Sequence, residues 1–559
     1  MYLFLSVCGN IYVVIFMTNK EYADLLLPNV EHDWTYYEEK YPKRDLKEGQ
    51  MVTRFAPSPT GFVHMGSLYA SFLDLQVAKQ TNGVCMLRIE DTDGKRTVEN
   101  GVQGIIDDFK NLNINFTEGM GFGGNYGPYL QSDRKDIYQA YAKKLIEEDK
   151  AYPCFATEEY LNEIREYQAQ KKIRIGIYKK YAKDRDLSRD EVLEKIKNGE
   201  KYVIRLKSPG DFDNKVVLHD LIKGDIEMPE NDIDEVLIKS DGLPTYHFAH
   251  AIDDHLMHTT HVIRGDEWVS SYPKHEQFFK VLGFEMPKYA HIAPISKREG
   301  NIVRKLSKRK DEDAAISYYV KKGIPTEVIR LYLATICNYD FEEWYTANPT
   351  KSIDDFTFEF NKCPIGVTVF DIEKLMSISK IYFSRLKNTT LFDMLDKYTK
   401  EYDVDFNNII NKDKEYTLNI LNIERDIERP RKDIGALEEV KSSIWYMYPE
   451  LFDENTEEYA EVKACDKQIV IDYLNNVYDA NDDQETWFNK VKEFAVNNNY
   501  CADKKVYKED PDKYNGMVSD FCALLRIIIC KKNQSPNIYY LIKYLGKDEL
   551  LKRVELFYK

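Results

Sequence analysis

Residues 51–93 read MVTRFAPSPTGFVHMGSLYASFLDLQVAKQTNGVCMLRIEDTD, and this stretch decides the fold class. An apolar segment at 52–56 leads into a turn rich in Pro and Gly. A helical pattern at 67–81 and a second apolar segment at 84–91 follow. The order strand, turn, helix, strand predicts an α/β unit. We expect Gly66 and Ser67 to cap the start of the helix, and Asn82 and Gly83 to end it.

The turn before this helix is suited to a phosphate group, because a helix N-terminus presents free N–H groups and the positive end of the helix dipole. Gly66 has no Cβ and would let a ligand approach the backbone closely. His64 could donate a hydrogen bond to an anionic oxygen from the same turn. Taken alone, a His-x-Gly string is more often part of a structural loop.

A second candidate lies at residues 304–310, RKLSKRK, where five basic residues surround one Leu and one Ser. Such a cluster can neutralise a transferring phosphoryl group. Taken alone, it is more often a solvated surface or a nucleic-acid patch.

Together the two strings resemble the signature sequences of class I aminoacyl-tRNA synthetases, with HMGS at 64–67 and KLSKR at 305–309. Further strings are similar to those of the bacterial glutamyl-tRNA synthetases. They are RFAPSPTG at 54–61, LRIEDTD at 87–93, KSDGLPTYH at 239–247, DDHLM at 253–257 and VIRGDEW at 262–268. The resemblance is strong to about residue 380, and from there to the end it is mainly a pattern of helices.

This resemblance implies an α/β, Rossmann-like catalytic domain with an inserted acceptor-binding domain, followed by all-α C-terminal domains. The implied boundaries are an N-terminal extension at 1–50, a catalytic domain at 51–310 with the insertion at 116–219, a region contacting the tRNA stem at 311–370, and a helical anticodon-binding domain at 371–559. Within the catalytic domain we expect a second helix from Val98, with Val98, Val102, Ile105, Phe109 and Leu112 in the core. We also expect helices at 160–200 and strands at 202–240.

The family's reaction uses ATP with Mg²⁺ to activate glutamate and then transfers it to tRNA. We expect three groups of residues to take part, the first two by the resemblance and the third by its local positive charge. The catalytic group is His64, Gly66, Ser67, Lys305, Ser307 and Lys308, of which His64, Gly66, Lys305 and Lys308 would bind ATP. The glutamate-binding group is Arg54, Ala56, Ser58, Glu90, Tyr246 and Arg264. The tRNA-binding group is Lys171, Lys172, Arg174, Lys179 and Lys180.

Three positions depart from the family pattern. Ser67 stands at the last position of the first signature, where it would serve as a small hydroxyl at the helix start. His250 occupies a place near the amino-acid pocket where relatives often carry Asn. Cys154 is a single thiol where some relatives bind zinc through a Cys-x-Cys pair, and because a tetrahedral site needs four ligands we expect no zinc.

The charge of the chain bears on whether it binds a nucleic acid. The chain of 559 residues has a net charge of −16, which by itself argues against nucleic-acid binding. However, residues 165–185 contain eight basic and two acidic residues. We expect this segment to contact the tRNA acceptor end, with an affinity that falls steeply with salt, although a solvated helix stays an alternative.

The nine cysteines form no ligand-spaced cluster, and we interpret them as free thiols in a reducing compartment. The apolar segment at 2–17 lacks a basic start and is too short for a spanning helix, so we expect a cytoplasmic protein. We hypothesise that translation begins at Met17. The strings at 121–127 and 94–97 only superficially resemble nucleotide-binding loops, and we expect both to be turns.

Several functions remain open at this level. The leading hypothesis is a monomeric enzyme that glutamylates tRNA(Glu), and tRNA(Gln) is a possible second substrate. A glutaminyl enzyme and a glutamylating paralogue that acts without tRNA fit less well, the latter because of the helical half at 371–559. A non-catalytic RNA-binding paralogue is the alternative from another class.

Overall fold

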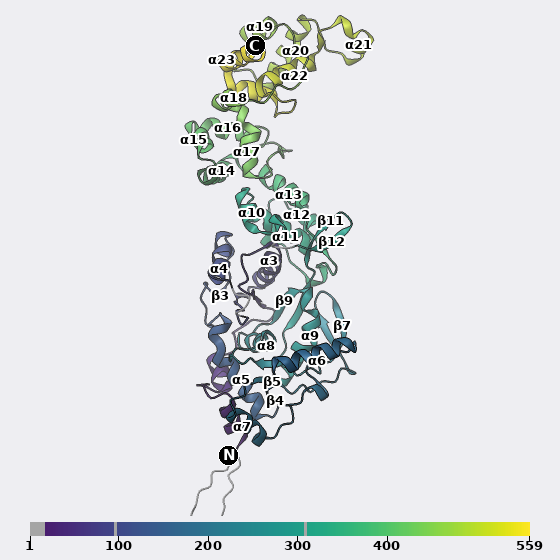
Figure 1. The fold of residues 1–559 in the computed structure, drawn as a ribbon. Helices are drawn as coiled ribbons and strands as arrows, with labels where there is room; N and C mark the ends of the chain where they lie inside the picture. Colours follow the sequence, from purple (N-terminus) through teal and green to yellow (C-terminus); the bar gives the residue numbers. More distant parts are fainter. Residues whose placement is uncertain (1–16, 94–97, 307–309) are drawn as a thin grey trace, which may run out of the picture. The chain divides into compact units, whose positions relative to one another are not determined.

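The computed structural model describes residues 17–93, 98–306 and 310–559. The chain divides into two compact units (Figure 1). The first comprises Met1–Ile316 and Arg330–Asp371, and the second comprises Ser317–Ile329 and Ile372–Lys559. We call them the α/β unit and the helical unit.

The α/β unit contains the predicted strand, turn, helix and strand. β1 (Val52–Phe55) pairs in parallel with β2 (Val84–Leu87), with Val52 opposite Val84, and α3 (Met65–Gln80) connects them. β3 (Glu118–Gly119) pairs in parallel with the other edge of β2. A parallel pair needs such a crossover, which explains why the helix separates the two strands in sequence.

A second sheet has the order β7-β6-β10-β9. Its strands are β6 (Lys215–Asp220), β7 (Gly224–Pro229), β9 (His261–Gly265) and β10 (Lys288–Ile292). β9 and β10 are parallel, and β9 lies against β1, where the Thr260 N–H donates to the Val52 carbonyl at 2.9 Å. As a result β1, β9 and β10 end at the same side of the unit.

Two smaller sheets complete the α/β unit. One has the order β4-β5-β8 and the other β12-β11-β13. The strands are β4 (Ala151–Cys154), β5 (Val203–Leu206), β8 (Val236–Ile238), β11 (Ile295–Glu299), β12 (Ile302–Lys305) and β13 (Thr368–Val369). The other helices of this unit are α1 (Asn19–Leu26), α2 (Trp34–Lys40), α4 (Gly101–Asn111), α5 (Lys135–Glu147), α6 (Glu158–Gln170), α7 (Arg189–Lys197), α8 (Tyr246–Leu256), α9 (Tyr272–Leu282) and α12 (Phe341–Ala347).

The N-terminal extension packs on this unit through α1 and α2. Leu26 and Tyr37 are buried in the same core as Tyr141 of α5. Tyr141 donates a hydrogen bond to Glu38 at 2.7 Å, and Tyr41 donates one to the Gly127 carbonyl at 2.9 Å. The extension is therefore folded onto the α/β unit from α1 onward.

The helical unit is built from short helices around its own apolar core. Its helices are α13 (Ile372–Ser384), α14 (Asn388–Tyr402), α15 (Val404–Lys412), α16 (Lys414–Asn422), α17 (Val440–Ile444), α18 (Pro449–Glu454), α19 (Lys467–Asn476), α20 (Gln484–Asn497), α21 (Lys504–Glu509), α22 (Val518–Cys530) and α23 (Ile538–Phe557). α10 (Ile316–Lys321) and α11 (Thr326–Cys337) carry residues of both units, and a two-stranded pair joins β14 (Tyr500–Cys501) and β15 (Gly516–Met517).

Three local predictions need correction. α3 begins at Met65, and the side chain of His64, not Gly66 or Ser67, caps it. α4 begins at Gly101, and Val98 is 48% exposed because it precedes the helix, whereas Ile105, Phe109 and Leu112 are buried. Residues 171–188 lie between α6 and α7 and form no α-helix, since the chain turns at Lys172 and Lys179, which both have positive φ.

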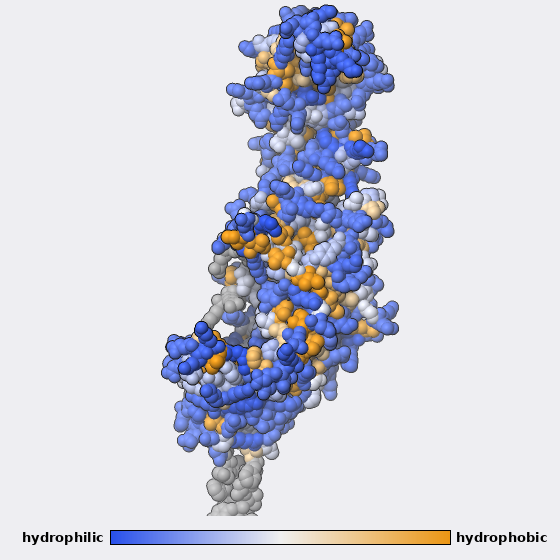
Figure 2. All heavy atoms as spheres, turned by 90° about the vertical axis from the view of Figure 1, so that its right-hand side faces the viewer, coloured by the Kyte–Doolittle hydropathy of each residue, from blue (hydrophilic) through white to orange (hydrophobic). Residues whose placement is uncertain are grey.

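The face shown in Figure 2 is mostly hydrophilic, with apolar side chains exposed in separate patches. Most large apolar side chains are in the cores. Within the described ranges, none of the helices combines the length and the apolarity that a membrane-crossing helix needs. The eight described cysteines are free thiols, and Cys8 lies outside the described residues.

Candidate active site

A cavity of about 670 Å³ lies in the α/β unit beyond the carboxyl ends of β1, β9 and β10. This is where open α/β sheets usually bind ligands. The cavity brings together ten of the residues expected from the sequence, namely Arg54, Ala56, Ser58, His64, Gly66, Ser67, Glu90, Tyr246, Arg264 and Lys305. Ser307 and Lys308, and the string at 94–97, lie outside the described residues.

His64 and Gly66 form one structural feature at the start of α3. The Ser67 N–H donates to His64 Nδ1 at 3.1 Å, so Nδ1 is an acceptor and the proton of the neutral ring is on Nε2. A Cβ on residue 66 would lie 2.9 Å from His64 Cε1. The missing Cβ of Gly66 thus also leaves room for the imidazole to fold back over the helix start.

Arg54 and Glu90 are held by buried charges. Arg54 Nε donates to Asp254 Oδ1 at 3.3 Å. Arg88 donates to the same Asp254 oxygen at 2.7 Å and to Glu90 at 3.0 Å. Burial raises the pKa of Glu90, although the positive charges of Arg88 and Arg54 oppose this. The cavity therefore presents one guanidinium group from β1 and one carboxyl group from the segment after β2 in fixed positions.

Arg264, the next-to-last residue of β9, is 5% exposed. Its Nε donates to His291 Nε2 at 2.9 Å, and its NH1 donates to His275 Nδ1 at 2.8 Å. Tyr246 lies in the same wall, with its ring 4.5 Å from that of Trp268. The cavity thus contains two separate arginine side chains, from β1 and from β9.

His250 does not belong to the cavity lining in the described structure. It is fully buried on α8, where Nδ1 lies 3.3 Å from Arg54 and Nε2 lies 2.8 Å from the Tyr289 hydroxyl. His250 therefore contacts the back of Arg54, not the cavity itself.

The basic run at 304–310 begins at the end of β12. Lys305 forms an ion pair with Glu267 at 2.8 Å, and Arg304 pairs with Asp311 at 2.7 Å and with Glu299. Lys305 lines the cavity, whereas Arg304 does not. Of these two described cations, Lys305 thus faces the cavity and Arg304 is held by carboxylates outside it.

Sequence reasoning missed several residues of this site. Trp268 and Glu267 line the cavity, and Arg88 and Asp254 lie behind it. All four stand in the strings that resemble the family, so the signal was present. What was missing was the pairing of residues from distant strings, which only the fold brings into contact.

The five basic residues expected at the tRNA lie in the segment between α6 and α7. Lys171, Lys172, Lys179 and Lys180 are exposed. Arg174 is partly buried, pairs with Asp232 and stacks on Phe212 at 3.5 Å. Arg185 likewise pairs with Asp234 at 2.6 Å. Because acidic residues from 211–234 pair with these arginines, the exposed positive charge is smaller than the local sequence suggests.

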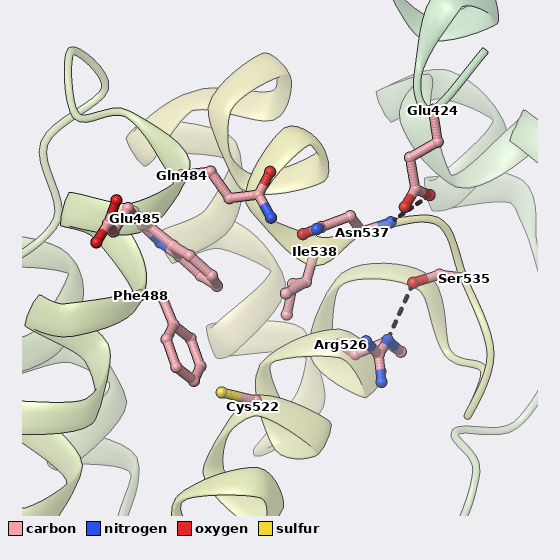
Figure 3. Close-up of a pocket in the computed structure, with 10 residues that line it drawn as sticks. Glu424, Gln484, Glu485, Phe488, Cys522, Arg526, Ser535, Asn537 and Ile538 are labelled. Carbon is pink, nitrogen blue, oxygen red and sulfur yellow. Dashed lines mark hydrogen bonds between the residues drawn. The ribbon is translucent and has the colours of Figure 1, made fainter. Parts of the chain in front are cut away.

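The helical unit has a cavity of its own, of about 710 Å³ (Figure 3). Phe488 of α20 and Cys522 and Arg526 of α22 line it, and Arg526 donates to Ser535 at 3.1 Å. Glu424 accepts a hydrogen bond from the Asn537 N–H at 3.0 Å at its edge. An aromatic ring beside an arginine and amide groups can hold a flat polar ligand.

Among the described residues, no group of three or more His, Cys, Asp and Glu side chains could hold a metal ion. Cys154 is buried at the end of β4.

The chain is similar in sequence to proteins of known family. The model of the family "tRNA synthetases class I (E and Q), catalytic domain" matches residues 50–369. A glutamate–tRNA ligase of Clostridium perfringens is 43% identical over 96% of this chain and its own full length. One of Clostridium beijerinckii is 44% identical over 97% of this chain and its full length.

A solved structure is also similar along most of the chain. It is a glutamate tRNA ligase from Elizabethkingia meningosepticum in complex with its amino acid. It has a TM-score of 0.73 and 25% identity, and covers 91% of this chain and 99% of its own. The similarity thus extends beyond the catalytic domain into the helical unit.

Proposed function

The chain belongs to the class I tRNA synthetases of the E and Q type, and from this premise we propose that it is a glutamate–tRNA ligase. One observation carries the choice of substrate: Arg54, Arg264 and Glu90 line the same cavity. Glutamate has two carboxylates and one ammonium group. Two guanidinium groups and one carboxylate are their complement in number and sign.

The first step joins glutamate to ATP. An oxygen of the α-carboxylate attacks the α-phosphorus of MgATP, and the bond to the β-phosphate oxygen breaks, which releases pyrophosphate. The attacking carboxylate is already charged, so the step needs no general base. Catalysis depends on positioning and on stabilising charge.

His64 Nε2 and the N-terminus of α3 would hold the phosphates. The proton of the neutral imidazole is on Nε2, and both His64 and Gly66 line the cavity. Lys305 would stabilise charge on the departing pyrophosphate after exchanging Glu267 for phosphate oxygens. Ser307 and Lys308 take part by resemblance to the family. Mg²⁺ enters with ATP as part of the substrate.

The glutamate would lie between the two arginines. Arg54 and Arg264 would bind its carboxylates, Glu90 its ammonium group, and Tyr246 would close the side-chain pocket, with Ala56 and Ser58 along the same loop. An arginine gains no ion pair from the amide of glutamine. This difference supports glutamate as the substrate.

In the second step a hydroxyl of the terminal tRNA ribose attacks the glutamyl carbonyl, and AMP leaves. Lys171, Lys172, Arg174, Lys179 and Lys180 would contact the acceptor end from the inserted domain, 116–219. Residues 311–370 would contact the stem. The exposure of the four lysines supports this role, whereas Arg174 would act through its place beside Phe212.

The helical domain, 371–559, would read the anticodon. The cavity between α20 and α22 supports this assignment, because an unpaired base could lie against Phe488 and bond to Arg526 (Figure 3). The enzyme would act as a cytoplasmic monomer.

Charging assays with purified tRNA(Glu) and tRNA(Gln) test the proposal. Glutamate- and ATP-dependent charging of tRNA(Glu) is the expected result, and charging of tRNA(Gln) as well would make the enzyme non-discriminating. ATP–pyrophosphate exchange with glutamate, measured with and without tRNA, tests whether activation waits for tRNA. Absence of both charging and exchange would favour a non-catalytic RNA-binding protein.

A further inference from the structure

Two histidines lie directly behind Arg264. His275 comes from α9 and His291 from β10, both are fully buried, and each accepts one hydrogen bond from the guanidinium. Neither belongs to the described residues that line the cavity. They therefore contact the arginine without lining the space where a substrate would bind.

The protonation of both rings follows from their partners. Arginine has only donors, so His275 Nδ1 and His291 Nε2 must be acceptors. His275 Nε2–H then donates to His247 Nδ1 at 2.8 Å, and His291 Nδ1–H donates to Asp220 Oδ2 at 2.6 Å. A second proton on either ring would place N–H against N–H. Each histidine is thus a neutral acceptor with a single tautomer.

Burial also favours the neutral form of these histidines. It lowers the pKa of His275 well below its usual value and that of His247 to about 3, and it also lowers the pKa of His291. The imidazoles accordingly stay neutral at physiological pH.

Because these two acceptors are neutral, they do not balance the positive charge of Arg264. Among the described residues, no carboxylate forms an ion pair with it, and Asp220 reaches it only through the ring of His291. Arg54 differs, because it is paired with Asp254. A buried cation without a counter-ion is costly, and a bound carboxylate would remove that cost.

We propose that His275 and His291 are positioning residues that fix the orientation of Arg264 without neutralising its charge, and that they thereby determine its affinity for a substrate carboxylate. This inference rests on the proposed function, in which that carboxylate belongs to glutamate. A carboxylate in place of either histidine would accept the same hydrogen bond from Arg264. However, it would also neutralise the positive charge that binds the substrate carboxylate.

The isosteric pair His275→Asn and His275→Asp separates these effects. The Asn oxygen can replace Nδ1 as a neutral acceptor, whereas Asp adds a negative charge beside the guanidinium. We expect the KM for glutamate of His275→Asp to exceed that of His275→Asn by about tenfold or more, with similar KM values for ATP. His275→Asp should also be at least as resistant to thermal unfolding, because it pairs with Arg264. Equal KM values for glutamate would overturn the inference.

A second pair covers the case in which His275→Asp does not fold. His291→Leu removes the acceptor for Arg264 Nε, and His291→Gln restores one near the same place. The KM for glutamate should rise in His291→Leu and should return close to the parent value in His291→Gln. Equal KM values would contradict the positioning role.

The matched control is His219→Asn, which changes an exposed histidine of β6 that pairs with Asp225. Its kinetics should equal those of the parent chain. The assay is tRNA charging over a range of glutamate concentrations. A parent chain that does not use glutamate would refute the proposed function, whereas an active parent with equal variant pairs would refute this inference alone.

Discussion

Arg54, in β1, donates a hydrogen bond to Asp254, in α8, at 3.3 Å, and both side chains are buried. The same carboxylate oxygen accepts from Arg88 at 2.7 Å. Burial by itself would raise the pKa of Asp254, but the positive charges of Arg88 and Arg54 outweigh it and lower that pKa. Asp254 thus joins two guanidinium groups under the floor of the cavity, and Glu90 is a second carboxylate partner of Arg88.

Asp254→Asn should destabilise the α/β unit strongly. The change leaves two buried cations with less negative charge, at a cost of about 3–5 kcal/mol in the free energy of unfolding. Chemical denaturation measures this loss. The control Asp225→Asn, at an exposed pair, should cost less than about 0.5 kcal/mol. A loss below about 1 kcal/mol in Asp254→Asn would show that Asp254 is not the main counter-charge.

Glutamate binding should weaken as the pH falls toward the pKa of Glu90, which burial raises. The ammonium group needs the ionised carboxylate, so the KM for glutamate should rise on the acid side, at a pH closer to neutrality than an exposed Glu would give. Pre-steady-state or steady-state kinetics from pH 5 to 8 test this. Glu90→Gln should raise the KM at every pH and remove the acid limb.

The raised pKa of Glu90 also predicts how the stability of the protein depends on pH. The folded state binds the Glu90 proton more tightly than the unfolded state, so this group favours folding below its unfolded pKa, and that contribution is lost as the pH rises through the folded pKa. The difference in unfolding free energy between Glu90→Gln and the parent should accordingly change with pH in this window. A constant difference would mean that the pKa of Glu90 is not raised.

Gly66→Ala should impair ATP binding with little effect on stability. The new Cβ would force the His64 ring to move and break its cap on Ser67, at a cost of about 1 kcal/mol. Replacing Gly by Ala within a helix returns a similar amount. The KM for ATP should rise several-fold while the KM for glutamate stays near the parent value. Gly104→Ala is the control, because a Cβ there meets nothing within 4 Å. An unchanged KM for ATP would mean that His64 does not hold the phosphates.

Arg264→Lys should lower kcat/KM for glutamate by more than about tenfold and spare ATP binding. Lysine keeps the charge but cannot bond to His275, His291 and a carboxylate in the same plane. The exposed control Arg165→Lys should be neutral. An unchanged kcat/KM in Arg264→Lys would remove Arg264 from the substrate pocket.

Replacing Lys171 and Lys172 by Ala should reduce the salt dependence of tRNA binding. Each phosphate contact contributes about 0.7–0.9 to the slope of log K against log salt, so loss of two contacts should lower the slope by about 1.4–1.8. Binding titrations at several salt concentrations measure it. Lys20→Ala, at an exposed position of α1, is the control. An unchanged slope would place the tRNA elsewhere.

The sequence by itself determined the α/β fold class, the family and ten residues of the cavity lining, because each depends on short contiguous strings. Local apolar spacing predicts a strand, a turn and a helix. The signature strings can be recognised without knowing which residues they contact. The predictions for the cap of α3 and for the burial of Val98 were wrong. The His64 ring folds back over the helix start, and α4 begins after Val98; both depend on local geometry that residue type does not fix.

Only the tertiary structure decided which charges meet. Arg54 pairs with Asp254, 200 residues away in the sequence. Arg264 contacts neutral histidines instead of a carboxylate, and Arg174 and Arg185 pair with Asp232 and Asp234. The net charge of −16 and the count of basic residues at 165–185 could not show this. Electrostatic energy falls with distance in space, and sequence separation does not report that distance.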